Sequence, residues 1–188
     1  MSQTILMITG DAGEALEVFY PKHRLEEEGW RVDVAALEKR AIRTVVHDFE
    51  PGDSTYTEKP GYRIDADLAI AEVRPEAYDG LVLPGGRAPE YLRNRREVVS
   101  VVRHFLDSRK PIAATCHAAL ILASAGSLRG RTLTCYPELE PDVRAAGGQF
   151  VDREVVVDDD LITARAWPDN GPWMREFIQS LRARANVT

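Results

Sequence analysis

The pattern of apolar and polar positions in the first forty residues predicts a strand, a helix and a second strand. Residues 5–9 form a short continuous apolar run, which is typical of a buried parallel strand. A helical pattern occupies residues 14–28, while residues 31–37 alternate and are rich in valine. This strand–helix–strand order predicts a doubly wound α/β sheet.

The middle of the chain continues the alternation of strands and helices. Apolar runs at residues 80–83 and 111–115 predict two further buried strands. A helix is predicted to begin near Pro89, an amphipathic helix follows at residues 97–109, and an apolar helix ends near Gly126. The remaining predicted elements are a strand at 132–134, a helix at 138–146, a hairpin at 151–164 and a helix at 173–183.

Residues 41–65 interrupt this pattern. Pro-Gly and Gly-Asp pairs mark turns there, and residues 55–57 could form an edge strand. We therefore predict an irregular insertion that lies over the edge of the sheet. His47 stands close to two acidic residues, but no second His or Cys lies at ligand spacing, so we predict no metal site.

Length and charge narrow the class of protein. The 188 residues suffice for one domain, and 44% apolar with 29% charged residues is typical of a soluble globular protein. The net charge of −6 argues against a nucleic-acid partner, and we interpret the basic run Arg93–Arg96 as an exposed helix face. The amino terminus does not resemble a signal peptide, and the longest apolar run, residues 118–123, is too short to span a bilayer. We expect a cytoplasmic protein with a single domain, residues 1–188, and no membrane partner.

Cys116 is the main candidate for chemistry. It stands where the strand at residues 111–115 turns abruptly into a helix between small residues, which is the pattern of a nucleophile elbow. A thiol in the first turn of a helix faces unpaired N–H groups, so we predict that this position favours the thiolate. A cysteine in an apolar run is otherwise a core residue, and we assign that role to Cys135.

Pro84–Gly86 is the second informative stretch, because it follows the buried strand at residues 80–83. Two glycines after a strand allow backbone N–H groups to approach a ligand closely. The N–H groups of Gly85, Gly86 and His117 are therefore candidates for an oxyanion hole. The same stretch is equally typical of a plain tight turn between a strand and a helix.

Glu17 receives two different interpretations. Helical spacing places it roughly with Arg24 and Glu28 on a polar face, which predicts an exposed side chain. Pro21 removes the helical hydrogen bond to the carbonyl of Glu17, which predicts a kink, and kinked helices often border sites.

These motifs together resemble the ThiJ/PfpI superfamily, within the class I glutamine-amidotransferase-like proteins. The resemblance covers nearly the whole chain and implies a flavodoxin-like three-layer α/β sandwich. Its sheet would be mostly parallel, with helices on both faces and a nucleophile elbow. The matching stretches are Glu17–Pro21, His23–Trp30, Leu81–Glu90, Lys110–His117, Ser124–Gly130 and Trp173–Phe177.

The resemblance also implies roles for single residues. In this family the glutamate at the place of Glu17 reaches the cysteine and carries a proton, which overrides the interpretation of Glu17 as exposed. A second set would join Cys116 and His117 to a glutamate of a neighbouring subunit, which corresponds to Glu90. This set implies a homo-oligomer, a dimer, trimer or hexamer. Because neighbouring helix residues diverge around the axis, His117 need not face the sulfur.

The insertion carries a narrower resemblance. Residues 47–50 and 55–61 look like the insertion of plant-type glyoxalase III members, so His47 joins the predicted pocket residues, together with Trp167 and Ala118. Ala118 and Ala119 depart from the family pattern, because relatives commonly have Gly-Pro or Gly-Gln after the Cys-His pair. We expect this change to alter the shape of the pocket.

Three functions are compatible with these residues. The first, which we favour, is a glyoxalase III-like or deglycase-like enzyme that needs no cofactor. It would convert small carbonyl substrates, 2-oxoaldehydes such as methylglyoxal, to hydroxy acids through a hemithioacetal on Cys116. The second is an intracellular cysteine peptidase or amidase of the PfpI type that uses Cys116, His117 and Glu90. The third is a non-enzymatic redox-sensing stress protein in which Cys116 is oxidised.

Overall fold

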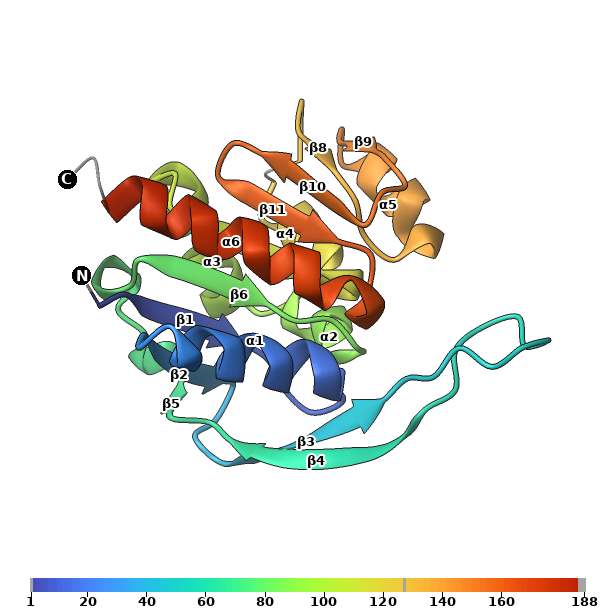
Figure 1. Cartoon of the computed structure of the whole chain (residues 1–188), viewed down its shortest axis with the longest axis horizontal. Coiled ribbons are helices and arrows are strands. Elements are labelled where there is room, and N and C mark those ends of the chain that lie inside the picture. Colours follow the sequence, from blue (N-terminus) through green and yellow to red (C-terminus); the bar gives the residue numbers. More distant parts are fainter. Residues whose placement is uncertain (1, 127, 186–188) are drawn as a thin grey trace.

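The computed structural model describes residues 2–126 and 128–185, and a mostly parallel sheet separates two layers of helices in it (Figure 1). Within the described residues the strand order is β10-β11-β7-β6-β1-β2-β5. Neighbouring strands run parallel except β10 and β11, which form an antiparallel hairpin. The strands are β1 (Thr4–Ile8), β2 (Arg31–Ala36), β5 (Leu68–Ala69), β6 (Gly80–Leu83), β7 (Ile112–Thr115), β10 (Val155–Asp158) and β11 (Leu161–Ala164).

Both faces of this sheet are buried, and β1 shows why its sequence is continuously apolar. Ile5 and Met7 point into one hydrophobic core, whereas Leu6 and Ile8 point into the other. Helices α1 (Ala15–Glu27) and α6 (Asn170–Ala185) cover one face. The other side carries α2 (Ala88–Leu92), α3 (Arg96–Asp107), α4 (Ala119–Ser124) and α5 (Glu140–Ala145). The flavodoxin-like α/β sandwich is therefore confirmed.

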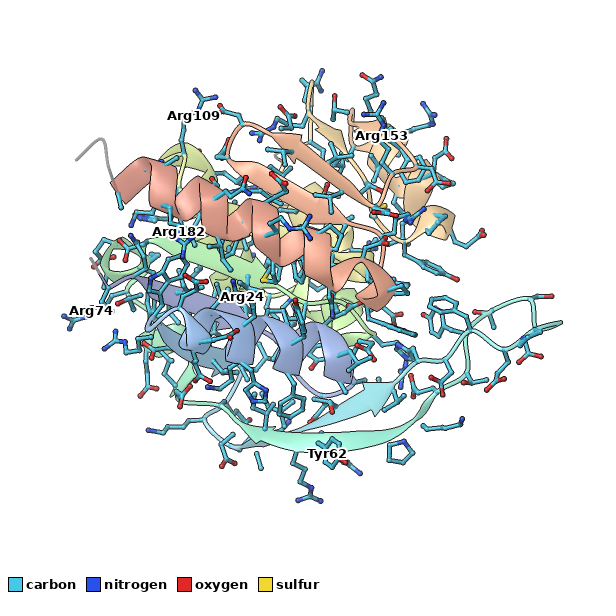
Figure 2. The ribbon with its side chains drawn as sticks, viewed as in Figure 1. Arg24, Tyr62, Arg74, Arg109, Arg153 and Arg182 are labelled. Atoms are coloured by element: carbon cyan, nitrogen blue, oxygen red, sulfur yellow. The ribbon has the colours of Figure 1, made fainter. Side chains whose placement is uncertain are left out.

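Residues 41–65 are more regular than predicted. β3 (Ala41–Val46) and β4 (Lys59–Asp65) pair in a separate antiparallel hairpin. The prediction of a strand at residues 55–57 is wrong, because the pairing starts at Lys59. Residues 47–58, which we call the arm, join the two strands and extend beyond the body of the molecule (Figure 1). Figure 2 shows Tyr62 on the outer side of this hairpin.

Several element boundaries also differ from the predictions. α1 continues through Pro21 as one helix, and α6 begins at Asn170, three residues before the predicted start at 173. A short strand at Gln149–Phe150 (β9), which the sequence pattern did not indicate, pairs with β8 (Thr132–Leu133) in a small parallel sheet. One position of the 124–130 motif, Ser127, lies outside the described residues.

Two surface features bear on possible partners. Asn94, Arg95 and Arg96 are exposed, but most of the basic run lies in the junction between α2 and α3 instead of along a helix face. In the described part of the chain, the helices are too short or too polar to cross a membrane.

Candidate active site

Cys116 stands in a strained bend at the carboxyl end of β7. Its φ of 54° lies in the left-handed region, which a non-glycine residue adopts only at a cost of about 1–3 kcal/mol. A turn of 3₁₀ helix, Cys116–Ala118, follows and leads into α4. The side chain is 5% exposed, so it lies almost completely inside the protein. The chain thus forms the abrupt strand-to-helix turn that the sequence predicted. Cys135 is buried in the hydrophobic core.

Glu17 lies against the same bend, although helical spacing predicted an exposed side chain. It is 0% exposed, and its carboxyl group lies close enough to the side chain of Cys116 for each to affect the pKa of the other. Its Oε2 also accepts a hydrogen bond from the Gly85 N–H at 2.8 Å. The prediction from spacing is wrong because the first turn of α1 faces the crevice at the carboxyl ends of the strands, where polar groups supply partners.

The hydrogen bond to Glu17 changes the predicted oxyanion hole. The Gly85 N–H donates to the carboxyl group, so it is not free to hold a substrate oxygen. The backbone N–H groups of Gly86 and His117 point at the Cys116 sulfur instead. These two donors remain candidates for the oxyanion hole, and Gly85 serves to fix the carboxyl group.

Gly85 leaves room for the contact between the acid and the thiol. A Cβ at this position would lie 2.4 Å from the Cys116 Cβ and 2.6 Å from Glu17 Oε2. We expect Gly85→Ala to lower the turnover proposed below by at least about 100-fold, because a displacement of about 1 Å at a reacting centre has effects of this size. Steady-state kinetics with purified protein check this. Gly171→Ala is the matched control, since a Cβ there meets nothing within 4 Å. Equal activity of the two variants would contradict the close packing.

Glu14 forms a second buried carboxyl group beside Glu17. Its side chain caps α1 by accepting the Glu17 N–H at 2.8 Å. Burial raises the pKa of Glu14 to about 7. Burial, together with the nearby charge of Glu14, raises the pKa of Glu17 well above its usual range. Both effects favour the protonated form of Glu17.

The place of Cys116 at a helix start does not lower the pKa of its thiol below the usual range. Burial raises the pKa of the Cys116 thiol, and a negative charge on Glu17 would raise it further, whereas the N–H groups of Gly86 and His117 act in the opposite direction. The prediction that the first helical turn favours the thiolate is therefore wrong for the resting site. A thiolate here requires Glu17 to keep its proton and a route for the thiol proton to leave.

His117 faces the sulfur, a point that helix geometry alone left open. Its Nδ1 lies 3.2 Å from Cys116 Sγ, because the left-handed backbone of Cys116 departs from a regular helix. The imidazole ring stacks on the ring of Tyr136, with centroids 5.1 Å apart and an angle of 20° between the planes. Burial lowers the pKa of His117 to about 4, so the ring is neutral at pH 7.

Glu90 stands apart from this set. It is exposed on α2, and within the described residues no hydrogen bond or ion pair joins its carboxylate to Cys116 or His117. Its predicted contribution to the site of a neighbouring subunit stays a prediction.

The structure places two of the three predicted pocket residues near the site and the third in the hydrophobic core. His47 is 4% exposed, its carbonyl accepts the Trp167 Nε1–H at 2.8 Å, and both residues lie close to the active-site residues. Ala118 is 0% exposed and belongs to the hydrophobic core, so its prediction as a pocket residue is wrong. The 3₁₀ turn directs its methyl group inward. Among the described residues no group of three His, Cys, Asp or Glu could hold a metal ion.

Sequence reasoning missed Glu14, Tyr56 and Tyr136. Glu14 precedes an apolar helical stretch, and acidic residues are enriched at helix starts, so this signal was available. Tyr56 lies in the arm and Tyr136 after β8, in segments without periodicity. Only the tertiary structure brings their rings to His117.

Comparisons with known proteins agree with this fold. The model of the DJ-1/PfpI family matches residues 3–180. Deglycase PH1704 of Pyrococcus horikoshii is 42% identical over 178 residues, which cover 95% of this chain and 99% of that protein. Protein/nucleic acid deglycase 2 of Escherichia coli is 37% identical over 184 residues, covering 97% of this chain and all (100%) of that protein.

Two further relatives come from eukaryotes. Protein DJ-1 homolog D of Arabidopsis thaliana is 39% identical over 193 residues, which cover 99% of this chain but 48% of that protein. The crystal structure of Drosophila melanogaster DJ-1beta superposes with a TM-score of 0.79 at 26% identity, covering 100% of this chain and 99% of that one. On the strength of the family match and these relatives, the chain belongs to the DJ-1/PfpI family.

Proposed function

We propose that this protein is a cysteine-dependent enzyme that converts 2-oxoaldehydes such as methylglyoxal to hydroxy acids without glutathione or a cofactor. The observation that carries the proposal is the arrangement around Cys116, whose sulfur contacts Glu17 on one side and lies 3.2 Å from His117 Nδ1 on the other. Similarity to proteins named deglycases supports an activity of this kind.

In the proposed reaction the Cys116 sulfur attacks the aldehyde carbon as a thiolate. The carbonyl oxygen becomes an oxyanion beside the N–H groups of Gly86 and His117 and takes the proton of Glu17, giving a neutral hemithioacetal. Glu17, now a carboxylate, removes the hydrogen from the former aldehyde carbon as a proton and leaves an enediolate.

The second half of the reaction returns this proton. Glu17 delivers it to the neighbouring carbon, which forms a thioester of the hydroxy acid on Cys116. Water then attacks the thioester, the carbon–sulfur bond breaks and the thiolate is restored. One molecule each of methylglyoxal and water give lactate and one proton. The raised pKa of Glu17 suits this cycle, because the group must begin protonated.

The direct test uses purified protein in buffer free of glutathione. We expect lactate to form from methylglyoxal in proportion to enzyme concentration, measured by NMR or by a coupled lactate assay. Peptide-amide reporters are assayed in parallel, because the peptidase alternative uses the same cysteine. Cleavage of the peptide amides without lactate formation would overturn the proposal in favour of the peptidase. Failure to form lactate or cleave amides would leave the redox-sensing alternative.

A further inference from the structure

The arm places a tyrosine on the far side of His117 from the sulfur. The Tyr56 hydroxyl lies 3.5 Å from His117 Nε2, and the two rings meet edge to face with centroids 6.0 Å apart. His117 Nδ1 faces Cys116 Sγ. The imidazole therefore bridges a thiol and a phenol, one at each ring nitrogen. A separation of 3.5 Å is at the long limit for a hydrogen bond, and such contacts often shorten when a substrate binds.

Several contacts fix Tyr56 in this position. Its ring lies 4.4 Å from the His47 ring and 5.4 Å from the Tyr136 ring, measured between centroids. The next part of the arm is tied to the body, because the Glu58 carboxylate accepts two hydrogen bonds from Arg87, at 2.6 Å and 2.7 Å. Glu58 also contacts His47 Nε2 at 3.1 Å. The two-point contact with Arg87 resists rotation of Glu58.

We propose that Tyr56 is a positioning residue that, acting through His117, carries the thiol proton of Cys116 away from the sulfur. The proposal rests on the role of Cys116 as the nucleophile in the function proposed above. It adds a third group, supplied by the same chain, to the pair of Cys116 and His117.

The relay conserves protons and leaves the imidazole neutral. The thiol proton of Cys116 moves to His117 Nδ1, the proton on Nε2 moves to the Tyr56 oxygen, and the hydroxyl proton of Tyr56 passes to water. The products are a thiolate, a neutral imidazole with its proton on the other nitrogen, and an unchanged phenol. A simple transfer to His117 would instead create a buried cation, which its pKa of about 4 disfavours. Burial raises the pKa of Tyr56 to about 12, so the phenol also stays neutral.

The charges around the relay come from every neighbouring element. The carboxyl groups of the first turn of α1 lie on the side of the sulfur, and the other groups act on the two aromatic rings. The titratable groups whose charges act on the relay are Glu14, Glu17, His47, Glu58, Tyr136 and Asp142, and Glu90 acts weakly from its exposed position. Since Tyr56 already contacts Nε2 within one chain, the relay does not require a carboxylate from a neighbouring subunit.

The test measures the thiol directly and needs no substrate. The rate at which iodoacetamide alkylates Cys116 is followed against pH by peptide mass spectrometry, which separates Cys116 from Cys135. After the relay, His117 Nδ1–H donates to the thiolate while Nε2 accepts from the Tyr56 hydroxyl, so this hydroxyl stabilises the thiolate form at equilibrium. We expect Tyr56→Phe to move the midpoint of this profile upward by about one pH unit and to slow alkylation at pH 7 by about tenfold. Phenylalanine keeps the ring contacts and removes only the hydroxyl. A wild-type profile for Tyr56→Phe would overturn the relay.

Two further variants serve as matched controls for Tyr56→Phe. Tyr62→Phe removes a hydroxyl from a tyrosine of the same hairpin that is 80% exposed, and it should keep the wild-type profile. Glu90→Gln should also keep it; a shift as large as that of Tyr56→Phe would overturn the single-chain relay in favour of a partner carboxylate. The outcome is independent of the proposed function. If Tyr56→Phe shifts the alkylation profile but the wild-type protein forms no lactate, the proposed function is wrong and the relay is still supported.

Discussion

Cys116→Ser will lower the glutathione-independent conversion of methylglyoxal to lactate by on the order of 10³-fold or more, because removal of a catalytic nucleophile has effects of at least this size. Serine is nearly isosteric with cysteine and fits a side chain that is 5% exposed, so the fold should be unchanged. Its hydroxyl ionises far less readily than a thiol, and neither Glu17 nor His117 can compensate for this difference. Steady-state kinetics, with circular dichroism to verify folding, provide the measurement.

Cys135→Ser is the matched control for this variant. Cys135 is also buried, at 1% exposure, and its Sγ hydrogen-bonds the backbone carbonyl of Tyr136. A serine hydroxyl can make the same bond, so we expect turnover within about twofold of wild type at a modest loss of stability. If Cys116→Ser turned over like wild type, or if Cys135→Ser lost the activity instead, the assignment of the nucleophile would be wrong.

Glu17→Gln should be the second most damaging substitution, with turnover lower by about 10²–10⁴-fold, the usual contribution of a general acid–base group. The amide keeps an oxygen to accept the Gly85 N–H, which now donates at 2.8 Å, but it cannot give and take back a proton. We therefore expect lactate formation to fail, whereas the hemithioacetal can still form when its oxygen takes a proton from water in place of Glu17. Rates of substrate binding and of product release are measured separately by stopped-flow kinetics.

Stability distinguishes this effect from misfolding. Because burial raises the pKa of the native Glu17 carboxyl well above its usual range, the unfolded chain gives up this proton at a lower pH than the native protein does. Wild type therefore loses stability as the pH rises from the usual range of a carboxyl up to the raised pKa, and a glutamine does not titrate. Glu17→Gln should thus be at least as stable as wild type at pH 7, and its advantage should shrink as the pH is lowered toward about 4. Glu27→Gln, at an exposed position of α1, is the control and should leave turnover unchanged. Normal turnover by Glu17→Gln would exclude the proton-carrying role.

The fold was largely predictable because its central strands are buried on both faces. A strand such as Thr4–Ile8 must be apolar at every position to serve two cores, and this leaves a clear signal in the sequence. The hairpin at Ala41–Asp65 was harder, since one of its faces is exposed and a register shift between Arg43 and Val45 interrupts the alternation. Turn signals in the arm obscured the strand that follows.

The site was predictable only where local geometry dictates it. The bend at Cys116 requires small neighbours and leaves a signature in the sequence, and so do the glycines at the end of Gly80–Leu83. Helical spacing predicted that Glu17 is exposed, and only the resemblance to the family indicated that its side chain reaches Cys116. Tyr56 is far from His117 in the sequence, and both Tyr56 and Tyr136 lie in segments without a periodic pattern. Only the folded chain brings the three rings together.

The most direct test of the covalent mechanism is ¹³C NMR of the Glu17→Gln protein mixed with methylglyoxal labelled at the aldehyde carbon. This variant should stop after addition of the sulfur. We predict a new protein-bound signal of a hemithioacetal carbon, at up to one equivalent, that disappears when Cys116 is also replaced by serine. Signals of free and hydrated methylglyoxal alone, identical in both proteins, would contradict the account.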